Sequence, residues 1–267
     1  MIDLHSHILP GFDDGAKDDD VALKMLRIAA ADGITKIVAT PHVIEGEWLP
    51  SWESIISACT RLSQFATDQG INVNIMPGAE VAVHFDLLDR LIRPGPYCIN
   101  GGKYILVELP ASQIPAFGEE FFFVLQARGF MPVLAHPERH PEIARKPQIL
   151  RNWIEKGLLV QMNGTSLTGE MGERIKKFAE MLLVNRMVHC LGSDAHGIGR
   201  RRPKLMQAAK KITTLVGRAA AAQIISANPA SLLRGEDIEI PAANSDDYYS
   251  LQNENTFQKF MKKLTNT

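Results

Sequence analysis

The chain has 267 residues, of which 45% are hydrophobic, and this content is enough to bury one large core. Lys and Arg number 29 against 30 Asp and Glu, so the formal net charge is -1 and there is no overall basic field to hold a nucleic-acid backbone. The sequence therefore predicts one main domain and excludes nucleic acid as the first choice of partner.

The cysteines and the apolar runs indicate the cellular compartment of the protein. Cys59, Cys98 and Cys190 form no CxxC pair and are odd in number, which argues against a disulfide framework and suits a reducing cytoplasm. We expect all three in the core. The opening MIDLHSHILPG lacks a basic segment followed by a long apolar stretch, and no run of about 18 apolar residues occurs anywhere, so we expect neither export nor membrane insertion.

Seven short β-rich segments recur along the chain. They are MIDLHSH at the start, ITKIVATPH after Gly33, INVNIMPGAE after Gly70, KYILVELP near 103–110, FMPVLAH after Gly129, LLVQMN after Gly157 and MVHCLGSDAH near 187–196. Helical segments such as 18–32, 51–69 and 170–185 separate them, and a glycine just past a helix is the usual left-handed stop. The aspartates at 18–20 indicate an acidic helix start, favoured by the helix dipole.

Apolar strands that alternate with helices indicate βαβ units and a parallel sheet covered by helices. Seven such strands predict an α/β fold of the distorted (β/α)7 barrel type, similar to a TIM barrel. An open doubly wound sheet is the simpler alternative. From about residue 236 the sequence becomes rich in Asn, Asp and Ser, with one short helical pattern near Phe257–Leu264. We therefore expect a main domain of residues 1–235 and an accessory polar tail of residues 236–267.

Every apolar run ends in a residue that can bind a metal ion or form a hydrogen bond. These residues are, in chain order, His5 and His7, His42, Glu80, Glu108, His136, Asn163, and Asp194 with His196. In a parallel barrel the carboxyl ends of all strands open onto one face, so these side chains should converge there. Buried carboxylates beside imidazoles are costly unless cations compensate them. The pattern therefore predicts a metal cluster, and its mixed His and carboxylate ligands favour zinc, manganese or iron.

The motifs that carry these residues resemble the polymerase and histidinol phosphatase (PHP) superfamily. HSH, FDDG with Asp14, TPH, PGAE, VEL, AHPER and GSDAH occur in that order between residue 1 and about residue 235. More narrowly, MIDLHSHILPGFDDGAKD and AHPER resemble the manganese-dependent protein tyrosine phosphatases of bacterial capsule and exopolysaccharide synthesis.

The resemblance implies three divalent ions per chain, Mn²⁺ first and Zn²⁺, Fe²⁺ or Mg²⁺ as alternatives. The implied ligands form three groups: His5, His7, Glu80 and Asp194; Glu80, Glu108 and His136; and Asp14, His42 and His196. Glu80 would bridge the first two ions. Two arginines would bind the substrate phosphate. One is Arg139 in AHPER, and the other lies in the run Arg200, Arg201 and Arg202, where the spacing from Asp194 favours Arg201.

A thiol mechanism is excluded by the sequence. Such a mechanism needs an arginine six positions after the cysteine, but Phe65, Tyr104 and His196 stand at those positions. Hydrolysis would then use water activated by bound metal ions. The resemblance implies phosphotyrosine on an autophosphorylating bacterial tyrosine kinase as the substrate.

Three other functions stay open at this point. A small-molecule phosphatase, acting on histidinol phosphate or a sugar phosphate, could use the same ligands. A nuclease or proofreading module is disfavoured by the balanced charge. A non-catalytic interaction domain predicts missing ligands, whereas all nine positions are filled.

Overall fold

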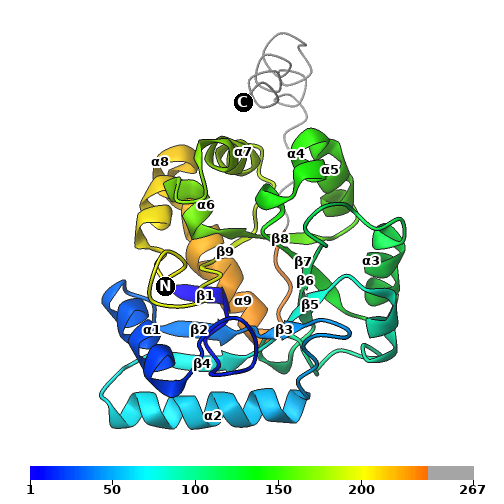
Figure 1. Ribbon diagram of the computed structural model, residues 1–267. Coiled ribbons are helices and arrows are strands. Elements are labelled where there is room, and N and C mark those ends of the chain that lie inside the picture. Colours follow the sequence, from blue (N-terminus) through cyan, green and yellow to red (C-terminus); the bar gives the residue numbers. More distant parts are fainter. Residues whose placement is uncertain (240–267) are drawn as a thin grey trace.

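Strands and helices alternate in the computed structural model, which describes residues 1–239 (Figure 1). The strands are β1 (Ile2–Ser6), β2 (Lys36–Ala39), β3 (His42–Val43), β4 (Asn74–Pro77), β5 (Glu80–Ala82), β6 (Tyr104–Glu108), β7 (Met131–Ala135), β8 (Leu159–Asn163) and β9 (Cys190–Gly192). The α-helices are α1 (Asp19–Ala31), α2 (Trp52–Asp68), α3 (Gly118–Ala127), α4 (Pro141–Arg145), α5 (Pro147–Glu155), α6 (Gly164–Thr168), α7 (Glu173–Val184), α8 (Met206–Ala222) and α9 (Asn228–Arg234).

The strands form a ring of seven positions within the described residues. One parallel sheet has the order β1-β2-β4 and the other β3-β5-β6-β7-β8-β9. Only residues 40–41 separate β2 from β3, and only residues 78–79 separate β4 from β5, so each pair is one bent strand shared by both sheets. On the other side the Asp194 amide donates to the His5 carbonyl (2.8 Å) and the His7 amide to the Ala195 carbonyl (2.9 Å), which closes the ring. The predicted (β/α)7 barrel is confirmed.

The three helical segments expected by residue range are present. The expected segments 18–32, 51–69 and 170–185 correspond to α1, α2 and α7. The Asp18 carboxylate accepts a hydrogen bond from the Val21 amide (2.9 Å) and caps α1, because the first amides of a helix have no partner within it. Gly33 and Gly157 end the preceding helices with φ of 82° and 92°, a backbone region that glycine enters at little cost.

The barrel interior is apolar at one end and polar at the other. Its buried apolar cluster combines strand residues with Leu232 and Leu233 of α9; the strand members are Leu4, Val38, Tyr104, Leu106, Val133, Ala135, Leu159 and Cys190. Alternate residues of a strand face the same side, so the inward row of β6 runs from Leu106 to Glu108. The polar residues therefore collect at the carboxyl ends of the strands, while α9 packs at the opposite end.

Residues after α9 contact the amino end of β6. The Tyr104 hydroxyl donates to the Glu236 carbonyl (2.7 Å), and the Lys103 ammonium lies 2.6 Å from an Asp237 carboxylate oxygen. Ile238 packs against the interior cluster. Residues 240–267, with the helical pattern near Phe257–Leu264, lie outside the described residues.

Two further expectations concern the cysteines and the membrane. All three thiols are free and buried, as predicted. Within residues 1–239 no helix combines the length and the apolar character needed to cross a membrane.

Candidate metal centre

The nine predicted ligands lie together at the carboxyl end of the barrel. Four subsets have ligand atoms that all lie within 4.8 Å of one another: His5, His7 and Glu80; His5, His136 and Asp194; His42, Glu80 and Glu108; and His7, Asp14, His42 and His196. The subsets share members, so they form one continuous cluster. A single octahedral or tetrahedral ion cannot use so many ligands, and the cluster therefore has room for more than one ion.

The two histidines of the HSH motif lie against each other and against Glu80 and Asp194. The Nε2 atoms of His5 and His7 are 3.1 Å apart, and each lies 3.2 Å from Glu80 Oε2. Each also lies 3.6 Å from Asp194 Oδ1. These four side chains are almost fully buried, so their polar atoms face one another and not bulk water.

Glu80 lies between two parts of the cluster. Its Oε1 atom is 3.1 Å from His136 Nε2, which is itself 3.5 Å from Glu108 Oε1. Its other oxygen, Oε2, faces His42 Nδ1 at 3.2 Å. Within the described residues neither Glu80 Oε2 nor His42 Nδ1 makes a hydrogen bond, although both are buried. Buried polar atoms without a hydrogen-bond partner suit a bound cation, so the donor set fits a metal cluster.

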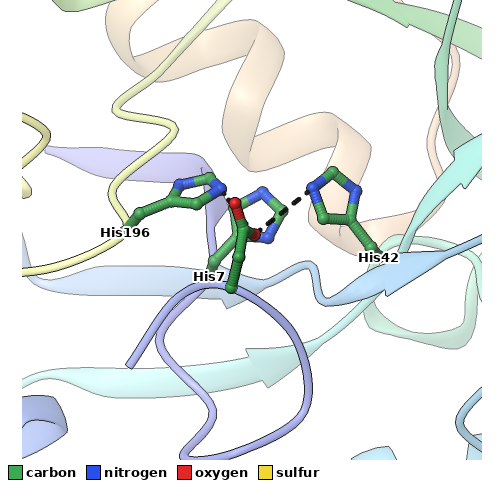
Figure 2. Close-up of side chains that lie close together, drawn as sticks. His7, His42 and His196 are labelled. Carbon is green, nitrogen blue, oxygen red and sulfur yellow. Dashed lines mark ion pairs between the residues drawn. The ribbon is translucent and has the colours of Figure 1, made fainter. Parts of the chain in front are cut away.

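A third part of the cluster combines residues from three distant segments. Figure 2 shows the imidazoles of His7, His42 and His196 grouped together. Asp14 Oδ1 lies 3.2 Å from His196 Nε2 and 3.7 Å from His42 Nε2. The ring centroids of His7 and His196 are only 3.8 Å apart. Asp14 is the most exposed member of this group, which places the third group on the solvent side of the cluster.

Two residues that the sequence reasoning missed hold the first histidines in orientation. Asp13 Oδ2 accepts from His7 Nδ1 (2.7 Å) and from the His42 amide (3.0 Å). Gln161 Oε1 pairs with His5 Nδ1 at 2.8 Å. Such contacts fix the ring and direct its other nitrogen toward the cluster. A buried glutamine in the apolar run LLVQMN was a readable signal, whereas nothing in FDDG distinguishes the roles of its two aspartates.

The loop that carries Asp13 requires a glycine at position 15. A Cβ there would lie 2.1 Å from the His7 carbonyl oxygen and 2.5 Å from the His7 Cβ, closer than atoms can pack. The loop is held against His7 by the Ala16 amide, which donates to the His7 carbonyl (3.0 Å). Gly15 therefore lets the FDDG turn fold back onto the HSH strand.

Two candidate ligands have left-handed backbones. His136 has φ of 33° and Asp194 has φ of 52°, values that cost side-chain-bearing residues energy. Val133 and Ala135 face the barrel interior, so a continuing strand would point His136 outward. The left-handed turn instead brings its ring to Glu80.

The electrostatics of the cluster favour bound positive charge. Burial alone would raise the pKa of Glu80, but contacts with His5, His136 and His7 hold that pKa well below its usual value. Burial would lower the pKa of His7, yet its hydrogen bond to Asp13 and its close contact with the negative charge of Glu80 raise the pKa to about 10. Burial and the negative charge of Glu80 raise the pKa of Glu108 to about 7. The buried carboxylates are therefore stable only beside bound protons or metal cations. A metal ion that binds must displace the proton from each imidazole nitrogen that it contacts.

Arg139 and Arg201 both point at the cluster. Arg139 Nη1 lies 2.7 Å from Asp194 Oδ2, and Arg201 Nη2 lies 2.6 Å from Asp194 Oδ1. Arg200 instead donates to the Glu170 carbonyl. Both Asp194-bound guanidinium groups are about one third exposed, so they line the open side of the centre.

Five histidines and four carboxylates gather at the carboxyl ends of the parallel strands of this barrel, the arrangement that the resemblance to the PHP superfamily implies. The family model described as capsular polysaccharide synthesis, CpsB/CapC, matches residues 1–234. The chain belongs to this family.

Relatives and solved structures agree with this assignment. The chain is 36% identical over 201 residues to the tyrosine-protein phosphatase YwqE of Bacillus subtilis, an alignment that covers 75% of this chain and 79% of YwqE. It is 27% identical over 238 residues to the tyrosine-protein phosphatase CpsB of Streptococcus pneumoniae, covering 87% and 98%.

A crystal structure from a study of YwqE and CpsB, described as unique metal-dependent tyrosine phosphatases, superposes with a TM-score of 0.86 at 32% identity and covers 91% of this chain and 98% of the other. An organophosphorus hydrolase variant superposes with a TM-score of 0.55 at 12% identity, covering 87% and 92%, and this likeness concerns the fold alone.

Proposed function

We propose that the protein is a cytoplasmic, metal-dependent protein tyrosine phosphatase that hydrolyses phosphotyrosine on a bacterial tyrosine kinase regulating capsule or exopolysaccharide synthesis. The observation that carries this proposal is that the nine candidate ligands lie together, with Arg139 and Arg201 on the solvent side of the cluster. The tyrosine phosphatase relatives support the substrate class. The three buried free thiols suit a reducing compartment.

The cluster would hold three divalent ions, with Mn²⁺ as the first choice. His5, His7, Glu80 and Asp194 would form the first group, Glu80, Glu108 and His136 the second, and Asp14, His42 and His196 the third. Bound there, the ions would supply Lewis acidity that lowers the pKa of water toward about 7 and neutralises phosphate charge. The protein holds these donors in place, because Asp13 and Gln161 orient His7 and His5. Glu80 faces the first group with Oε2 and the second group with Oε1.

The substrate phosphate would be bound by Arg139 and Arg201. A guanidinium has five N–H donors in a planar fork, and a single bond to Asp194 leaves others free to face two phosphate oxygens. Both groups sit beside Asp194, so a phosphate bound by them lies against the ligand cluster. Their contacts strengthen as charge moves onto the nonbridging oxygens during transfer, which favours the transition state.

An aryl phosphate suits this site better than an alkyl phosphate. A phenol leaves with a pKa of about 10, so it needs less help from a general acid than an alkoxide does. The Trp48 indole stacks on His42 with ring centroids 5.3 Å apart and planes 14° apart. This partly exposed indole lies beside a candidate ligand, so a tyrosyl ring bound at the metal centre can pack against it.

We further propose that residues 1–235 form the catalytic barrel and that residues 236–267 are accessory. Because Glu236 and Asp237 contact Tyr104 and Lys103, and Ile238 packs against the interior cluster, a test truncation is best placed after Glu239. The shortened chain should keep its metal content and its turnover of p-nitrophenyl phosphate, since every candidate ligand precedes it. Loss of that turnover in a shortened chain with an unchanged circular dichroism spectrum would show that the tail completes the site.

One experiment tests the function. Protein stripped of metal is reloaded with Mn²⁺, Zn²⁺ or Mg²⁺ and assayed on a phosphotyrosine peptide, histidinol phosphate and single-stranded DNA, with Glu80→Gln as the control variant. We expect Mn²⁺-dependent release of phosphate from the peptide, at a much higher kcat/KM than from histidinol phosphate, and no DNA cleavage. Preference for histidinol phosphate would make the protein a small-molecule phosphatase, and activity without any metal would overturn the mechanism.

A further inference from the structure

A second polar cavity of about 240 Å³ lies beside the loop that follows the last ligand pair. Its lining includes the cations Arg200, Arg202, Lys204 and Lys210 and the acids Asp32 and Glu170. None of these residues belongs to the candidate metal centre. The cavity is therefore separate from that centre.

The loop presents consecutive arginines to two different places. Arg201 faces the metal centre through its bond to Asp194, and its carbonyl accepts the amides of His196 (2.9 Å) and Gly197 (3.2 Å). Arg200 and Arg202, one residue to either side, line the cavity. Consecutive Cα atoms are about 3.8 Å apart, so the cavity begins directly beside the arginine assigned to the phosphate.

The cavity carries an excess of positive charge. Asp32 Oδ2 is occupied by the amides of Leu205 (2.6 Å) and Met206 (2.8 Å) at the start of α8. Arg200 donates to the Glu170 carbonyl and not to its carboxylate. Among the described residues, Arg202, Lys204 and Lys210 make no ion pair within 4 Å. Four cations around a concave site, only partly offset by two acids, favour an anion.

We propose that this cavity is a subsite for a second negatively charged side chain of the substrate peptide, a carboxylate or a second phosphotyrosine, close to the phosphotyrosine that is hydrolysed. The inference rests on the proposed function, since it takes Arg201 as the group that binds the reacting phosphate. An extended peptide advances about 3.3 Å per residue, so a side chain one to four residues from the reacting tyrosine reaches the cavity.

The test compares peptides that differ only beside the phosphotyrosine. One set has neutral flanks, a second carries a single Glu at one of the four positions on either side, and a third carries there a non-hydrolysable phosphonate analogue of phosphotyrosine. The Mn²⁺-loaded protein should favour the best-placed anionic peptide over the neutral one by about fivefold to tenfold in kcat/KM, the scale of one or two exposed ion pairs. The second and third sets separate a carboxylate site from a phosphate site.

Two charge-reversal variants locate the effect. Lys204→Glu with Lys210→Glu changes two cavity cations, and Lys177→Glu with Arg218→Glu makes the same charge change at two exposed positions that do not line the cavity. We expect the preference to fall below about twofold in the first variant and to persist in the second. An equal fall in both variants, or no preference in the wild-type protein, would overturn the subsite.

Binding separates this inference from the proposed function. Labelled peptides with the phosphonate analogue in place of the reacting phosphotyrosine are titrated with each protein, and fluorescence anisotropy gives Kd without any turnover. The protein could hydrolyse no peptide and still bind the anionic peptide more tightly than the neutral one, with the difference abolished only by Lys204→Glu and Lys210→Glu. That result would support the subsite and contradict the phosphatase assignment. Equal Kd values for neutral and anionic peptides refute the subsite whatever the activity.

Discussion

Asp13 offers a test of how the metal centre is held without touching a candidate ligand atom. Its carboxylate is almost fully buried and accepts three hydrogen bonds, from His7 Nδ1 (2.7 Å), the His42 amide (3.0 Å) and the Gly15 amide (2.9 Å). Asp13→Asn keeps the shape but removes the charge. One of its two positions becomes an NH₂ group, which then faces an N–H donor and loses at least one of the three bonds.

The magnitude follows from the bond that is lost. A hydrogen bond between a charged carboxylate and an imidazole contributes about 1.5–3 kcal/mol, which corresponds to a factor of roughly 10 to 150 in an equilibrium constant. The bond orients Nε2 of His7 toward Glu80 and Asp194, so its loss should appear mainly as weaker metal binding. We expect Asp13→Asn to weaken Mn²⁺ binding by about 10-fold to 100-fold.

The assay is a competition between metal-free protein and a fluorescent chelator, with Mn²⁺ as the titrant. Asp18→Asn serves as the matched control, because Asp18 caps α1 outside the cluster and its amide can still accept from Val21. Activity of Asp13→Asn should recover at saturating Mn²⁺. An affinity equal to that of the wild-type protein would refute the orienting role, and loss of the fold in Asp13→Asn would make Asp13 a structural residue.

Three further predictions concern other parts of the barrel. Glu80→Ala should lose about two metal equivalents, since Glu80 faces two ligand groups, whereas His42→Ala should mainly lose one. Elemental analysis measures both losses, and equal losses would contradict the bridging role of Glu80. Arg139→Ala should lower kcat/KM by well over tenfold at near-normal metal content, and Arg139→Lys should recover part of that loss. Near-normal kinetics of Arg139→Ala would show that Arg139 does not bind the phosphate.

Burial lowers the pKa of His189 to about 4, so the unfolded chain binds a proton between about pH 6.5 and pH 4 that the folded chain does not. The free energy of unfolding should therefore decrease as the pH is lowered from about 6.5 to about 4, by at most about 3 kcal/mol. His189→Asn should make the free energy of unfolding, measured with urea, less dependent on pH in this window.

The sequence predicted the barrel because its signals were local. Each strand is a short apolar run, and each of α1, α2 and α7 has a matching helical segment with an acidic or polar start. The candidate ligands were visible for the same reason, since each one except Asp14 closes an apolar run. Asp14 came only from the motif resemblance.

The features that the sequence did not predict depend on distant contacts. The bends that divide β2 from β3 and β4 from β5 arise where a strand passes from one sheet to the other, and no local pattern marks them. The role of Asp13 depends on a turn that folds back onto His7, which only the contact at Gly15 explains. Arg201 was already favoured over its neighbours by its spacing from Asp194, but the hydrogen bonds from the His196 and Gly197 amides to its carbonyl, which hold this stretch of the loop, could not be predicted.

The closure of the ring has a consequence for biosynthesis. His5 lies on β1, the first strand of the barrel, and His7 follows it directly, while their partners Asp194 and His196 follow β9, the last strand of the barrel. A nascent chain thus exposes its HSH pair through most of translation with no complete donor set to accompany it. The candidate metal centre therefore lacks part of its donor set until residue 196 has been made, and a chain cut short before residue 194 would leave the HSH pair beside an unpaired edge of β1.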